Sequence, residues 1–186
     1  MSVIASFDTI AAALLFLTDF FECAMDTLQT SPLGAVFDID DTMLSSYDST
    51  TIQPVKLLWD LCGRLGLKRY IVTARPEMAL SDGETNESFT VTELQAHGID
   101  GWDQLYMMPY QEYKRCRGNA APYKERVRRR IKEQENDGQP LLVNIGDQWG
   151  DMTINPERLY NQHGNDQVCV GYFDDTAVVG VKLPCM

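Results

Sequence analysis

The chain has 186 residues and a formal net charge of −11, because 27 Asp and Glu outnumber 16 Lys and Arg. That length suits one domain with a full core and is short for two, so a single domain over residues 1–186 is expected. Hydrophobic residues make up 44% and charged residues 23%, which excludes disordered and fibrous classes. The acidic balance argues against binding to a nucleic-acid backbone and favours a small substrate.

Cysteine content and the amino terminus bear on the compartment. The five cysteines are odd in number, widely spaced and without a Cys-x-x-Cys pair, which favours free thiols in a reducing compartment over disulfides. The apolar run at residues 10–17 has no Lys or Arg before it and is too short to cross a membrane. A cytoplasmic protein with no membrane partner is therefore expected.

Residues 1–30 are predicted to form an amphipathic helical layer. Apolar residues recur there at alternating steps of four and three, as on one face of a long amphipathic helix or of a bent pair of helices. They are Val3, Phe7, Ile10, Leu14, Leu17, Phe21, Ala24 and Leu28. The helix either packs beside the sheet of the domain or mediates dimerisation, and the break at residues 31–34 separates it from the first predicted strand.

The segment 34–186 is predicted to be the core of the domain, because strands and helices alternate along it. Strands are expected near residues 35–39, 68–73, 105–108, 141–145 and 168–172, and helices near 52–65, 91–97 and 121–136. Thr90 and Glu93 read as a capping box for the second helix, while Pro122 and Gly138 mark the start and end of the third. The alternation indicates an α/β fold with a Rossmann-like, doubly wound, mostly parallel sheet.

Two acids follow the first predicted strand of the core. Asp38 and Asp40 are two residues apart, so in an extended chain they share a face and reach one reacting group. Open α/β sheets hold their ligands at the carboxyl ends of strands. A pair of carboxylates there can divide the chemistry, one attacking as nucleophile and the other moving protons.

Further polar residues follow in a fixed order along the chain. Thr73 and Arg75 come at the end of the second strand, Lys124 opens a helix, and Asp147 and Asp151 follow a later apolar strand. This order resembles the motifs of the haloacid dehalogenase (HAD) superfamily. Within it, residues 38–45, 146–151 and 181–184 are similar to plant vegetative-storage-type and bacterial class C acid phosphatases, a resemblance that runs from about residue 30 to the end.

The resemblance implies a mechanism through an aspartyl-phosphate intermediate. Asp38 would be the nucleophile and Asp40 the acid and base. The metal would be surrounded by Asp38, Asp147, Asp151 and the backbone carbonyl of Asp40. Asp151 would be either a direct ligand or an anchor of metal-bound water. Thr73 and Lys124 would bind the phosphoryl group; Arg75 would bind phosphate or brace an acid.

Charge considerations favour Mg²⁺ as the cofactor. Each pair of like charges 4 Å apart costs about 4 kcal/mol at an effective dielectric of ~20, so clustered acids and a phosphate dianion need a cation. Oxygen ligands suit Mg²⁺. His97 and His163, the two histidines, lie away from the acid motifs, which argues against zinc.

Several other residues have simpler interpretations. Asp41 is expected to stabilise a turn, the basic run at residues 126–132 to form a solvated, ion-paired helix face, and the tryptophans to pack in or near the core. Tyr47, Tyr110 and Tyr113 are candidates for contact with a flat leaving group. No stretch is long enough for a large cap, so only a minimal one is expected.

The predicted function is hydrolysis of phosphomonoesters with Mg²⁺, on nucleotides or other small esters. The alternatives are a weakly active or inactive binding or storage protein on the same fold, and a phosphatase for a phosphorylated macromolecule. A receiver-type signalling domain also uses acids, Thr and Lys, but its lysine comes last in the chain. Here Lys124 precedes Asp147 and Asp151, which favours the phosphatase.

Overall fold

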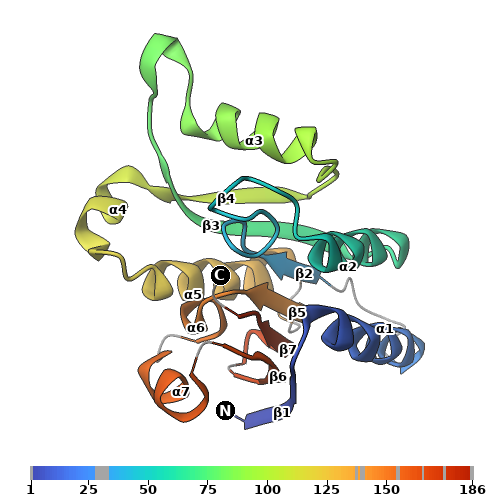
Figure 1. Cartoon of the computed structure of the whole chain (residues 1–186). Coiled ribbons are helices and arrows are strands. Elements are labelled where there is room, and N and C mark those ends of the chain that lie inside the picture. The colour runs from blue at the N-terminus through green and yellow to red at the C-terminus, as the bar shows by residue number, and fades with distance from the viewer. Residues whose placement is uncertain are drawn as a thin grey trace.

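The chain folds around one mostly parallel β-sheet (Figure 1). The computed structural model describes residues 2–27, 34–136, 138, 141–153, 156–164, 166–173 and 175–184. Within these ranges seven strands form a single sheet in the order β1-β6-β7-β5-β2-β3-β4. The strands are β1 (Ser2–Phe7), β2 (Gly34–Phe37), β3 (Lys68–Glu77), β4 (Gln104–Pro109), β5 (Leu141–Gly146), β6 (Val168–Tyr172) and β7 (Ala177–Lys182).

The strand order places the binding crevice at β2 and β5. β2 pairs in parallel with β3 on one side and with β5 on the other, while β4 and β7 extend the parallel part outward. From β2 the chain first adds strands on one side and then crosses to the other, and ligands of open α/β sheets bind at such a switch point. The predicted α/β fold with a mostly parallel, Rossmann-like sheet is confirmed.

Helices cover both faces of the sheet. The longer ones are α1 (Ile10–Thr27), α2 (Gln53–Arg64), α3 (Asn86–Ala96), α5 (Ala121–Arg130) and α7 (Pro156–His163), and the shorter ones are η1 (Ser81–Gly83), α4 (Tyr110–Cys116), the π-helical turn η2 (Ile131–Glu135) and α6 (Trp149–Met152). α1 and α2 lie on one flank of the sheet and α5 on the opposite flank (Figure 1).

Alternation along β2 distributes its side chains between two apolar clusters. Phe37 packs in a cluster with Leu17 of α1 and Trp59 of α2, whereas Val36 points into a second cluster with Val127 of α5. All four residues of β2 are buried, as expected for a central parallel strand covered on both faces. The strand is thus held rigidly just before the first acid motif.

The amino-terminal segment departs from the prediction that residues 1–30 are helical. Residues 2–7 form the edge strand β1, antiparallel to β6, and only then does helix α1 begin at Ile10. Val3 and Phe7 therefore lie in a strand, because an open sheet edge at β6 offers backbone partners that a helix cannot use. α1 itself is confirmed, with Leu17 and Phe21 buried, while the predicted stripe residue Leu28 lies outside the described residues.

The other predicted core elements agree closely with the structure. The five strands predicted from residue 35 onward correspond to β2, β3, β4, β5 and β6, and the sheet gains β1 and β7, which were not predicted. The helix predicted near 121–136 is α5 followed by η2. Pro122 lies in its first turn, and Gly138 follows it with a positive φ of 76°. In the described part of the chain, no helix is long and apolar enough to cross a membrane.

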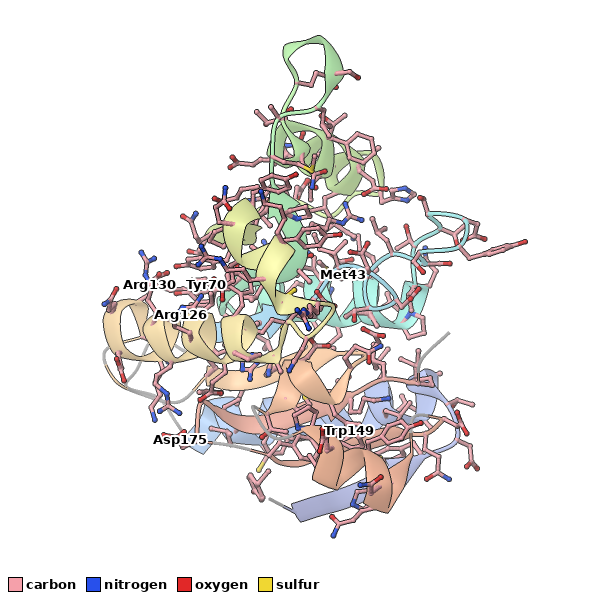
Figure 2. The ribbon with its side chains drawn as sticks, turned by 90° about the vertical axis from the view of Figure 1, so that its left-hand side faces the viewer. Met43, Tyr70, Arg126, Arg130, Trp149 and Asp175 are labelled. Atoms are coloured by element: carbon pink, nitrogen blue, oxygen red, sulfur yellow. The ribbon has the colours of Figure 1, made fainter. Side chains whose placement is uncertain are left out.

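The basic run on α5 and η2 is ion-paired, as predicted. Arg129 contacts Glu125 at 2.7 Å and Asp175 at 3.1 Å, and Lys132 also contacts Asp175 at 3.1 Å. Figure 2 shows Asp175 beside the end of this helix. Arg128 corrects the expectation of a wholly solvated face, because its side chain is 1% exposed and turns into the core with a contact to Glu125.

Candidate active site

The first acid motif begins where β2 ends. The Asp38 N–H donates to the carbonyl of Ile145 at 3.0 Å, which joins the end of β2 to β5 and leaves the Asp38 side chain at the floor of the crevice. Asp38 is 6% exposed. Burial raises its pKa well above the ordinary value, although the nearby Lys124 ammonium acts in the opposite direction. Asp38 is thus an enclosed carboxylate that depends on cations to stay ionised.

A tight turn follows Asp38 and presents Asp40 to the same pocket. The N–H groups of Met43 and Leu44 both donate to the carbonyl of Ile39, at 2.8 and 3.0 Å. Asp41 adopts a left-handed φ of 55° and accepts hydrogen bonds from Ser46, so it stabilises the turn as predicted. The Asp40 carboxylate contacts the Arg75 guanidinium at 2.6 Å, whereas Asp38 contacts Lys124.

Lys124 is the buried cation of the site. Its ammonium nitrogen lies 2.9 Å from Asp38 Oδ1 and also contacts Asp151 Oδ1, and the residue is only 5% exposed. Burial disfavours its charge, but the carboxylates of Asp151 and Asp38 outweigh this and hold its pKa above the ordinary value. The first turn of α5 positions Lys124, and α5 begins at Ala121 after Asn119 Oδ1 accepts the Ala121 N–H at 3.2 Å.

Three buried carboxylates converge at the carboxyl ends of β2 and β5. Asp38, Asp147 and Asp151 each offer an oxygen, and these oxygens lie within 4.8 Å of one another. Burial and the neighbouring Asp151 raise the pKa of Asp147 from 3.8 to about 6. In the described part of the chain, Lys124 contacts two of these acids, Asp38 and Asp151. The all-oxygen donors of the cluster fit a hard divalent cation such as Mg²⁺.

The loop between Asp147 and Asp151 is shaped by local hydrogen bonds. The backbone N–H of Gln148 donates to Asp151 Oδ2 at 2.9 Å, and the Gln148 side-chain amide donates to Asp147 Oδ2 at 2.6 Å. The Asn144 amide donates to the Asp151 carbonyl. Gly146 is required because a Cβ there would collide with the Asp151 side chain. These contacts orient both acids toward Asp38.

Thr73 lies at the expected place in the sheet, on β3 beside β2. It is fully buried, and its hydroxyl oxygen accepts the Arg75 backbone N–H at 3.1 Å. Because that bond uses a lone pair, the hydroxyl hydrogen stays available as a donor. Thr73 is not among the described residues that line the pocket, so its contact with a phosphoryl group stays a prediction.

Arg75 braces an acid, one of its two predicted roles. Its guanidinium contacts both oxygens of Asp40, and on the other side its Nη1 lies 2.6 Å from Glu93 Oε2 and 3.3 Å from the Thr90 hydroxyl. Arg75 thereby connects Asp40 to helix α3. Phosphate binding by Arg75, the other role, stays a prediction.

The same contacts correct the prediction of a capping box at Thr90 and Glu93. α3 begins five residues earlier, at Asn86, and its capping box consists of Thr85 and Ser88. Thr90 and Glu93 are therefore inside the helix, on the side that faces Arg75. Both patterns contain a hydroxyl residue three positions before a polar one, so sequence spacing alone could not separate them.

A pocket of about 590 Å³ opens at the clustered acids and Lys124. The structure brings together five of the seven predicted site residues on the wall of this pocket. They are Asp38, Asp40, Lys124, Asp147 and Asp151. The wall also contains residues that were not predicted. They are Asp41, Ala74, Gly118, Asn119, Ala120, Ala121, Gln148, Trp149, Gly150, Pro156, Glu157, Tyr160 and Asn161.

The aromatic residues of the pocket differ from those predicted. Trp149 and Tyr160 line it, whereas Tyr47, Tyr110 and Tyr113 are absent from its described lining. Tyr47 is 95% exposed, at the tip of the turn after the first motif. Tyr160 lacked a sequence signal, because helix α7 carries no recognisable motif and reaches the pocket only through tertiary packing.

Comparison with known families agrees with this geometry. Residues 47–167 match the family described as HAD superfamily, subfamily IIIB (Acid phosphatase). The matched segment contains Thr73, Lys124, Asp147 and Asp151 and begins after Asp38 and Asp40, whose assignment therefore rests on position and contacts. A comparison with curated proteins finds no match. The chain belongs to subfamily IIIB of the HAD superfamily, the acid phosphatases, which are phosphoric monoester hydrolases.

Proposed function

We propose that this protein hydrolyses small phosphomonoesters, nucleotides among them, with Mg²⁺ and through an aspartyl-phosphate on Asp38. One observation carries the proposal. Asp38, Asp147 and Asp151 form an oxygen-rich cluster with Lys124 at the floor of a pocket large enough for a small ester. Such a floor can hold a phosphate dianion only where cations offset the carboxylates.

The residues that would hold Mg²⁺ are Asp38, Asp147 and Asp151, with the backbone carbonyl of Asp40 as a further oxygen. When bound, Mg²⁺ would neutralise charge on the phosphate and on the nucleophile. Lys124 would bind a phosphoryl oxygen from the side of α5, and Thr73 would donate its hydroxyl hydrogen to another. Together these groups would place phosphorus in line with Asp38.

In the first chemical step a carboxylate oxygen of Asp38 would attack phosphorus. The new P–O bond would form as the bond to the leaving oxygen breaks, and Asp40 would give that oxygen a proton. In the second step a water would attack phosphorus, pass a proton to Asp40 and release phosphate as the Asp38–phosphorus bond breaks. Both carboxyl groups would return to their starting states.

Phosphate release from p-nitrophenyl phosphate and a panel of nucleoside monophosphates tests the proposal. We expect turnover that needs Mg²⁺, stops on chelation and is abolished in Asp38→Asn. Asp60→Asn serves as the matched control, because Asp60 pairs with Lys56 on α2, outside the residues that line the pocket. Retained turnover in a folded Asp38→Asn protein would refute the assigned nucleophile.

A further inference from the structure

We propose that helix α7 forms the subsite for the leaving group, where Tyr160 contacts a flat leaving group and Glu157 favours a neutral or cationic one over an anionic one. The inference rests on the proposed function, because it assumes that the phosphoryl group binds at Asp38. It adds a substrate preference that the catalytic residues alone do not specify.

One side of α7 faces the pocket. Pro156, Glu157, Tyr160 and Asn161 line it, at positions that lie close together on a helix surface, while Leu159 is 2% exposed and packs into the core. Tyr160 itself is 53% exposed. A half-exposed aromatic ring on a pocket wall offers a flat apolar face without a partner in the described part of the fold, which suits stacking with a planar group.

Trp149 ties α7 to the catalytic loop. Its indole N–H donates to the carbonyl of Gly164 at 2.8 Å, just beyond the end of α7, and its ring centroid lies 6.0 Å from that of His163. Figure 2 shows Trp149 at the junction of α6 and α7. Since Trp149 lies between Asp147 and Asp151 in the chain, these contacts connect the loop that carries the two acids to the end of α7.

The charges of the pocket argue against an anionic leaving group. Its described lining has six acids, which are Asp38, Asp40, Asp41, Asp147, Asp151 and Glu157. Lys124 is the cation among the described lining residues, and it already contacts Asp38 and Asp151. A divalent ion would serve the phosphoryl group, so a second anion would meet Glu157 with no further cation among the described lining residues to offset the repulsion.

A set of matched substrates tests the preference directly. We would measure kcat/KM of the Mg²⁺-loaded protein for phenyl phosphate, 4-carboxyphenyl phosphate and tyramine phosphate, whose leaving phenols are similar in size and acidity but differ in charge. Glycerol 2-phosphate provides a leaving group without a ring. We expect tyramine phosphate to exceed 4-carboxyphenyl phosphate roughly tenfold, with phenyl phosphate between them.

Three variants separate the two residues. Tyr160→Ala should lower kcat/KM for phenyl phosphate roughly fivefold relative to glycerol 2-phosphate, whereas Tyr160→Phe should keep the ratio. Glu157→Gln should reduce the difference between tyramine phosphate and 4-carboxyphenyl phosphate. Tyr172→Ala is the control, because Tyr172 is 49% exposed on β6 and is not among the described lining residues. Circular dichroism and thermal unfolding check that each variant is folded.

The outcomes distinguish this inference from the proposed function. A protein that shows Mg²⁺-dependent turnover, lost in Asp38→Asn, but treats all three aryl esters alike would overturn the subsite and leave the phosphatase intact. An unchanged ratio of phenyl phosphate to glycerol 2-phosphate in folded Tyr160→Ala would overturn the role of Tyr160. A wild-type protein without turnover of any ester would overturn the proposed function, and the subsite with it.

Discussion

Arg75 contacts both carboxylate oxygens of Asp40, with Nη2 2.6 Å from Oδ1 and Nε 3.1 Å from each oxygen. Because Glu93 and Thr90 hold the other side of the guanidinium, helix α3 helps to position the Asp40 carboxylate that the turn presents to the pocket. The proposed proton donor therefore depends on a helix that contributes no residue to the described lining of the pocket.

Arg75→Lys should lower kcat most for esters whose leaving group needs a proton from Asp40. Lysine cannot reproduce the planar, two-point contact, so Asp40 would be less well placed. We expect kcat for glycerol 2-phosphate to fall roughly tenfold or more, with a smaller loss for p-nitrophenyl phosphate, whose leaving group departs without protonation. Steady-state kinetics of both substrates give the result.

An arginine-to-lysine change on the surface provides the control for Arg75→Lys. Arg129→Lys alters an arginine that contacts Glu125 and Asp175 on α5, away from the pocket lining, and should leave both rates unchanged. If Arg75→Lys lowers the two rates equally, the main contact of Arg75 during turnover is with phosphate, the other predicted role.

Lys124→Met should abolish most turnover and strengthen Mg²⁺ binding. The lysine ammonium contacts two of the three clustered acids, so its removal leaves them without their buried counter-charge. We expect kcat to fall by about 10²–10³, as for other groups that stabilise transition-state charge. Calorimetric titration should show tighter Mg²⁺ binding, because the ion no longer meets a neighbouring cation.

Lys124→Arg separates charge from shape. It keeps the positive charge in a larger group, so Mg²⁺ affinity should remain near that of the wild type while kcat still falls. Near-normal kcat in Lys124→Met would show that Lys124 has only a structural role.

The metal-free protein should lose stability as pH rises through the range of about 4 to 6. The pKa of Asp147 is about 6 in the folded chain against 3.8 ordinarily, so the folded state binds more protons than the unfolded state in this window. The free energy of unfolding therefore falls as pH increases, by about 3 kcal/mol over the full shift of Asp147. Urea unfolding in the presence of chelator, at several pH values, measures the slope.

Asp147→Asn should flatten that slope, because the titrating group is gone. Mg²⁺ should also flatten it for the wild type, since the ion favours the ionised carboxylates. A slope that is identical in wild type and Asp147→Asn would show that other groups cause the pH dependence.

Gly146→Ala should displace the Asp151 carboxylate from the cluster of three acids. A Cβ at this position would collide with the Asp151 side chain, so either Asp151 turns away or the end of β5 moves. We expect a loss of about 1–3 kcal/mol in the free energy of unfolding, together with weaker Mg²⁺ binding. Chemical unfolding and calorimetric titration measure the two effects.

Gly150→Ala is the comparison in the same loop. Its Cβ would lie 3.1 Å from the Ala121 Cβ, a tight contact with α5 that does not involve an acid. It should lower stability with less effect on Mg²⁺ affinity. Equal Mg²⁺ affinity in Gly146→Ala and wild type would show that Asp151 does not depend on this glycine.

Local patterns in the sequence predict the alternation of strands and helices and the set of acids at strand ends. Strands that are buried on both faces, such as β2 and β5, read as short continuous apolar runs, and the acids of each motif directly follow those strands. The parallel sheet then requires Asp38 and Asp147 to meet, because neighbouring parallel strands end at the same edge.

Features that depend on contacts between distant segments of the chain could be seen only in the folded structure. Residues 2–7 form a strand because β6 offers an open edge. Arg75 contacts Asp40 and Glu93 only when β3, the turn after Asp38 and α3 are packed together. Tyr160 lines the pocket because α7 packs beside the loop of Trp149, whose indole N–H donates to the Gly164 carbonyl. Periodicity reports how each segment is buried, whereas these pairings depend on which segments become neighbours in the folded protein.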